Sequence, residues 1–232
     1  MLRRTASSNL NLEVIKDLAL KRATAKTYFA IGLSAISSIV IMYALNHYSG
    51  VAFYGELMFY LSMSTILFTF FSFGTRETVT KTMKIHDNDL SVFLSGFILD
   101  LLSSFTVIIL IYFFGVKILK LFQIFNVNLS YISNLVAFYT VFFICQSSFI
   151  GFLKYYNKLL FVNLASIFQN IINVSIIAFY IINENTTQTT IILAYVISTF
   201  FGLLFLFFSL LFFLKFKIKR FSKLFYVKCI CH

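Results

Sequence analysis

Asp100 is the residue whose chemical type and position point most directly to a function. It lies inside a long apolar segment, residues 90–115, ten residues after its start. A helical rise of about 1.5 Å per residue places it about 15 Å along a helix, close to the midplane of a bilayer core about 30 Å thick. An ionised carboxylate there costs about 2.5–3.5 kcal/mol. We expect Asp100 to face a bundle interior, either carrying a coupling ion or proton or packing through hydrogen bonds.

Polar side chains also form stripes along two other apolar segments. They are Ser62, Thr65 and Thr69 in residues 51–73, and Asn163, Ser166, Asn170 and Asn173 in residues 159–182. Spacings of three and four residues place side chains on one face of a helix. Small and amide residues at such spacings join membrane helices by packing and hydrogen bonds. The alternative is that the two stripes line a hydrated cavity that receives a polar cargo, and both interpretations stay open here.

Two cations at the ends of apolar segments are candidates for binding an anionic group. Arg76 follows the segment 51–73, and Lys154 follows the segment 131–153. Either could contact a phosphate that enters from the membrane surface. The alternative is that both are topology anchors, since basic residues flank membrane spans on the cytoplasmic side.

Catalytic and metal-binding constellations are absent from the sequence pattern. Of eight acidic residues, only Glu56 and Asp100 fall within apolar segments. There is no Gly-rich phosphate loop and no nucleophile motif. The terminal run Cys229-Ile230-Cys231-His232 offers three metal-ligand types but no established spacing. We therefore expect no enzyme activity, no cofactor and no metal site.

The elements that carry these residues are predicted to be membrane-spanning helices. The chain has 232 residues, 60% of them hydrophobic, and a mean hydropathy of +0.91. Apolar runs of about 20 residues are long enough to cross a bilayer as helices. Six such runs occur, at 28–45, 51–73, 90–115, 131–153, 159–182 and 190–214. The predicted fold class is all-α, a polytopic membrane bundle of about six transmembrane helices.

The basic residues predict the orientation of this bundle. All of the 19 Lys and Arg residues except Lys117 and Lys120 lie on one set of connections and on the two terminal segments. Cytoplasmic connections carry such an excess, so both termini are expected in the cytoplasm, with nucleic-acid binding excluded as the reason for the net charge of +11. The predicted organisation is a basic tail with an interfacial helix at 1–27, the bundle at 28–214 and a basic tail at 215–232.

Three local motifs occur at the ends of the predicted spans. The first is the turn into a Tyr-Gly pair, residues 46–55. The second is a helix end in Gly before a basic residue, Gly74-Thr75-Arg76, and the third is the Gly and Lys turn of residues 151–158. With these motifs the chain resembles the polysaccharide transporter family, the Wzx-like O-antigen flippases of the multidrug/oligosaccharidyl-lipid/polysaccharide superfamily. Members are built from two helix bundles, and this chain is similar to the first bundle only.

The resemblance implies a flippase that moves a polyprenyl-pyrophosphate-linked oligosaccharide across the cytoplasmic (inner) membrane for O-antigen, lipopolysaccharide or capsule synthesis. It implies membrane lipid and the lipid-linked oligosaccharide as partners, together with a second six-helix half or a second copy. The alternative is a non-transporting scaffold or remnant in a glycan-assembly complex. A hydrated cavity lined by Asp100 and the stripe from Asn163 to Asn173 is expected for a transporter, whereas a scaffold would close those faces by helix contacts.

Overall fold

The computed structural model describes residues 35–85, 89–121 and 129–230, with five positions before them (25, 28, 29, 32 and 33). For residues 89, 118–119, 121, 129 and 215–230 it describes the backbone alone. The described part consists of helices and short turns without a strand, which confirms the all-α fold class. The labelled helices are α2 (Val51–Phe71), α3 (Thr75–Thr82), α4 (Asp89–Leu121), α5 (Leu129–Tyr155), α6 (Leu159–Ile182) and α7 (Gln188–Ile230).

Five helical segments of the described chain are long and apolar enough to cross a membrane. They are Val51–Thr82, Leu90–Lys117, Ser130–Tyr155, Leu159–Ile182 and Gln188–Leu214. These segments match the last five of the six predicted spans and show a multi-pass membrane protein. Of the first predicted span, 28–45, residues 35–45 are helical and part of the remainder lies outside the described residues. Residues 1–24, which include most of the predicted interfacial helix, lie outside them too, and the predicted orientation stays a prediction.

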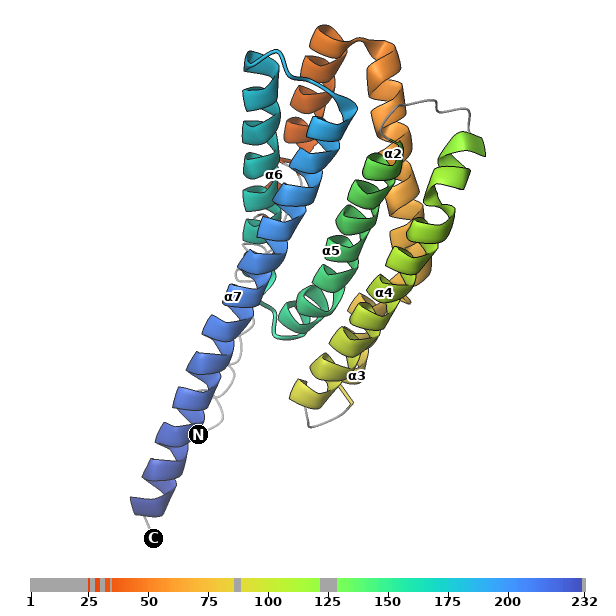
Figure 1. Cartoon of the computed structure of the whole chain (residues 1–232). Coiled ribbons are helices and arrows are strands. Elements are labelled where there is room, and N and C mark those ends of the chain that lie inside the picture. Colours follow the sequence, from red (N-terminus) through yellow and green to blue (C-terminus); the bar gives the residue numbers. More distant parts are fainter. Residues whose placement is uncertain are drawn as a thin grey trace, which may run out of the picture.

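Helix α5 is the centre of the bundle. It contacts each of the other five labelled helices, and in Figure 1 it lies between α4 on one side and α6 and α7 on the other. Of the hydrophobic windows of the five spans, that of α5 is the most enclosed, with 67% buried against 17% for α6. Helices α2 and α6 do not contact each other. Polar side chains on α5 can therefore reach partners on either side of the bundle.

Helix α7 continues past the predicted span 190–214. It contains 43 residues, so it is about 65 Å long at 1.5 Å per residue, roughly twice the thickness of a bilayer core. Its last turns extend beyond the neighbouring helices (Figure 1). The backbone of the predicted basic tail, as far as residue 230, is thus a continuation of the last span.

The helical segment Val51–Thr82 is divided into two helices. Helix α2 ends at Phe71 and is followed by Ser72, Phe73 and Gly74. The last two of these residues have positive φ angles, of 46° and 63°. Helix α3 begins at Thr75 and runs for eight residues. Glycine adopts the left-handed conformation without the steric cost of a Cβ atom, so Gly74 permits the break. The apolar pattern of residues 51–73 did not predict this second, polar helix.

Candidate functional site

Asp100 joins three helices at the break between α2 and α3. It has no exposed surface. Its Oδ1 accepts a hydrogen bond of 2.6 Å from the Thr75 hydroxyl. Its Oδ2 accepts bonds from the Ser148 hydroxyl at 2.6 Å and from the Ser148 backbone N–H at 3.0 Å. A buried carboxyl is tolerated when its oxygens accept hydrogen bonds in this way, and a carboxylate beside the first residue of α3 also faces the positive end of that helix.

The register of α5 gives a second measure of how deep Asp100 lies. Its partner Ser148 precedes Lys154 by six residues on α5, which is a rise of about 9 Å. Lys154 pairs with Glu77, which follows the other partner, Thr75, by only two residues. Asp100 is therefore about one and a half turns from a charged end of the bundle, nearer to it than counting along residues 90–115 suggested.

Two glycines allow α3, α4 and α5 to meet closely around this carboxyl. A Cβ atom on Gly96 of α4 would lie 2.4 Å from the Val79 side chain and 3.1 Å from the Ser148 hydroxyl. A Cβ on Gly151 of α5 would lie 2.6 Å from the backbone oxygen of Arg76. Small residues bring membrane helices into this kind of backbone contact. The hydrogen bonds of Asp100 depend on that approach.

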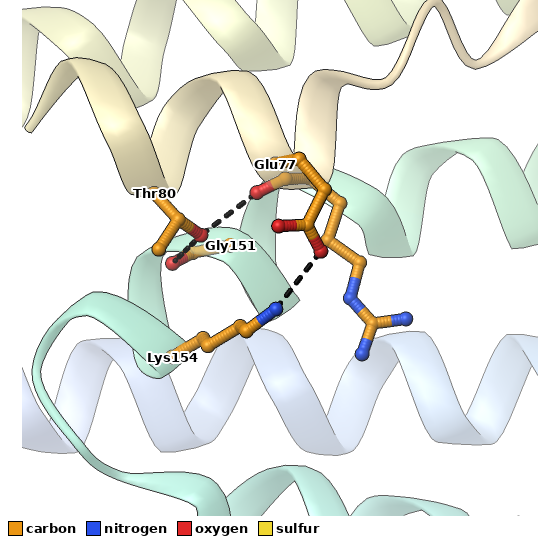
Figure 2. Close-up of polar contacts among 5 residues, drawn as sticks. Glu77, Thr80, Gly151 and Lys154 are labelled. Carbon is orange, nitrogen blue, oxygen red and sulfur yellow. Dashed lines mark hydrogen bonds and ion pairs between the residues drawn. The ribbon is translucent and has the colours of Figure 1, made fainter.

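The polar contacts between α3 and α5 continue on the other side of Gly151 (Figure 2). The Thr80 hydroxyl lies 2.8 Å from the Arg76 oxygen and 3.0 Å from the Gly151 oxygen, and it can donate its proton to either. Lys154 Nζ lies 2.8 Å from Glu77 Oε1. Of the two anion-contact candidates, Lys154 is therefore already paired with a carboxylate, whereas Arg76 has an exposed side chain.

A second polar layer connects α5, α6 and α7. Gln146 Nε2 donates to the backbone oxygen of Thr199 at 2.9 Å, and Gln169 Nε2 donates to the Thr199 hydroxyl at 3.1 Å. Gly202 gives these amides room, because a Cβ there would lie 2.8 Å from Gln169 Oε1. This layer is separate from the Asp100 contacts and acts as a join between helices.

The two predicted stripes have different environments. On α2, the stripe residues Ser62, Thr65 and Thr69 are exposed. On α6, Ser166 is exposed and Asn163 and Asn170 are half-buried. Asn173 is buried, its amide hydrogen-bonds Tyr195, and its Oδ1 has no hydrogen-bond partner. The hydrogen-bond partners of Asp100 are Thr75 and Ser148, which belong to neither stripe, so the structure does not bring the predicted site residues into one constellation.

The hydrogen-bond partners of Asp100 were missing from the sequence-based candidates. Thr75 follows the apolar run, and its importance depends on a helix break that hydropathy does not report. Ser148 and Gln146 lie within an apolar run, where polar residues are informative, and the triplet Gln146-Ser147-Ser148 was a usable signal. Among the described residues, no group of three or more His, Cys, Asp or Glu could hold a metal, and the side chains of the Cys229–His232 run lie outside them.

The chain was compared with protein-family models, curated proteins and solved structures. No family model, curated protein or solved structure matches it.

Proposed function

We propose that this chain is a membrane transporter component, one half of a flippase in the cytoplasmic membrane. Its cargo would be a polyprenyl-pyrophosphate-linked oligosaccharide used for a surface polysaccharide such as O-antigen or capsule. The motifs at residues 46–55, 74–76 and 151–158 support the choice of cargo by their resemblance to Wzx-like proteins. A second six-helix half or a second copy of this chain would complete the transport path.

The observation that carries this proposal is a row of exposed polar residues on α2 and α3, which lies beside the exposed apolar side chains of Ile66 and Phe70. Ser62, Thr65 and Thr69 are exposed on α2, and Arg76 is exposed on α3. These residues belong to one helical segment that is apolar and long enough to cross a membrane. Polar and charged groups in a span usually face a bundle interior or a water-filled cavity. Since the described helices leave them uncovered, a second wall and water between the walls would explain them.

A scaffold without transport activity is the second candidate, and one observation favours it. Asp100 and Asn173, two residues expected to line a cavity, are buried by helix contacts. A scaffold would use such contacts only to hold its helices together. The two functions therefore differ in whether the exposed face of α2 contacts water or another protein.

Complementation of a flippase-deficient bacterium tests the proposal. The chain is expressed alone and together with a second six-helix half, and surface glycan is measured after membrane insertion has been verified by fractionation. The proposal predicts surface glycan in at least one of these strains. Absence of glycan in both, with the protein in the membrane and a matched sugar supplied, would contradict transport and favour the scaffold.

A further inference from the structure

A groove lies between α3 and the first half of α4, on the side of α3 away from the Thr80–Gly151 contact. Its volume is about 340 Å³, which falls within the usual range for small-molecule sites. Hydroxyl residues and apolar residues share its lining: Thr75, Thr78, Thr82, Ser91 and Ser95, with Phe73, Val79, Val92, Gly96 and Leu99. Neither the Asp100 contacts nor the proposed transport function requires this groove.

The lining of the groove is more polar at one end than at the other. Thr75 contacts Asp100, and Val79 contacts Gly96, so α3 and α4 run antiparallel here. Thr82 therefore lies toward the Ser91 end and Phe73 toward the Leu99 end. Thr78, Thr82, Ser91 and Ser95 therefore gather at one end. The other end, near the helix break, is lined by Phe73 and Leu99 together with Thr75, whose hydroxyl already donates to Asp100. A ligand that fits both ends is an amphiphile.

The residues around the groove indicate which end faces lipid chains and which end faces the charged membrane surface. Along the outside of α4, exposed leucines and isoleucines continue from the groove, as expected for a surface against lipid chains; these are Leu90, Leu94, Ile98, Leu101 and Leu102. At the hydroxyl end, Lys81 is exposed three residues after Thr78, which makes the two side chains neighbours on the helix. Lys84 is also exposed, and Lys81 attracts the Glu77 carboxylate, which itself pairs with Lys154.

We propose that this groove binds one anionic phospholipid. The end between Phe73 and Leu99 binds part of an acyl chain. The hydroxyls of Thr78 and Thr82 offer hydrogen bonds to ester and phosphate oxygens, and Lys81 with Lys84 attracts the negative headgroup. Basic residues at a membrane surface attract anionic lipids by about 1 kcal/mol each. The bound lipid would brace α3 against α4 beside the helix break.

Photo-crosslinking in nanodiscs tests this site with the whole chain. The discs contain phosphatidylcholine and a small share of diazirine-labelled phosphatidylglycerol, and crosslinked peptides are mapped by mass spectrometry. The proposal predicts the strongest labelling within residues 78–99. Labelling spread evenly over the outer face of α4, as far as Leu102 and Phe105, would overturn it.

A matched pair of variants separates the groove from the general lipid surface. Ser95 and Thr106 are both exposed on α4 and both donate to the backbone oxygen four residues before them, but only Ser95 lines the groove. We expect Ser95→Leu to fill the groove and to lower labelling of residues 78–99 at least about fivefold, with Thr106→Leu unchanged. Equal labelling in the two variants would contradict the site.

The charge on the headgroup is tested with the same assay. The double variant Lys81→Gln/Lys84→Gln should lose the preference for labelled phosphatidylglycerol over labelled phosphatidylcholine while keeping chain labelling in the groove. An unchanged preference would overturn the anionic part of the proposal. This assay does not measure transport, so its outcome is independent of the complementation experiment.

Discussion

At the scale of single residues, Asp100 is a structural joint as well as a candidate for ion coupling. Its two oxygens accept hydrogen bonds from α3 and from α5, and no part of it is exposed. A coupling role would require the carboxyl to exchange a proton or an ion, which needs a second conformation that opens this contact. A purely structural role needs only the contact seen here.

Replacing Asp100 separates these two roles. In Asp100→Asn the amide oxygen can keep both bonds from Ser148, and the Thr75 hydroxyl can turn to accept from the new N–H₂ group. We expect membrane insertion to persist and the thermal midpoint to fall by only a few degrees, because about 1 kcal/mol is lost with one hydrogen bond. Transport, measured as surface glycan, should be impaired. Normal transport by this variant would remove Asp100 from the coupling mechanism.

Lys154 allows a similar distinction for the anion-contact candidates. Its ion pair with Glu77 is partly exposed, and exposed pairs contribute about 0–1 kcal/mol. Lys154→Gln and Glu77→Gln should therefore change the free energy of unfolding by less than about 1 kcal/mol. If Lys154 meets a pyrophosphate, only Lys154→Gln should reduce glycan transport. Equal transport in both variants would leave Lys154 as a topology anchor.

At the scale of elements, α3 is the least expected part of the molecule. It is a short polar helix, TRETVTKT, held against α5 by Gly151 and against α4 by Gly96. Hydropathy predicted α4, α5 and α6 because their apolar runs are continuous. The predicted span ended at residue 73, close to the end of α2 at Phe71. Hydropathy did not predict α3 itself, because this polar helix depends on the left-handed backbone of Gly74 and on the buried hydrogen bond between Thr75 and Asp100.

The close approach of α3 and α5 predicts an effect of a single methyl group. Gly151→Ala would place a Cβ 2.6 Å from a backbone oxygen of α3, so that one helix must move. Overpacking of this kind costs about 1–3 kcal/mol. The matched control is Gly55→Ala on α2, where a Cβ meets nothing within 4 Å and should be neutral or slightly stabilising.

Thermal unfolding of the purified protein measures both variants. A thiol-reactive dye reports unfolding through buried Cys145 in a background that carries Cys229→Ser and Cys231→Ser. We expect a lower midpoint for Gly151→Ala alone. If both variants unfold at the same temperature as the parent, α3 and α5 are far enough apart to leave room for a Cβ atom at position 151.

At the scale of the whole molecule, the fold class followed from the sequence and the site did not. Five spans could be located because about 20 apolar residues have no other stable environment. The arrangement of their polar faces depends on which helices touch, and α5 turned out to contact all the others. Asn173 and Asp100 became buried, whereas Ser62, Thr65 and Thr69 did not. A helical stripe alone carries no information about which neighbour will cover it.

Water accessibility of the uncovered face of α2 tests the central claim most directly. Thr65→Cys and Leu102→Cys each place a thiol at an exposed position in a span, one on the polar face of α2 and one on the apolar face of α4. The three native cysteines are replaced, and intact membranes are treated with a water-soluble maleimide that does not cross the membrane. This reagent should label Thr65→Cys rapidly and leave Leu102→Cys unlabelled. Equal protection of the two positions would show that the polar face of α2 contacts lipid or protein and would contradict a hydrated transport path.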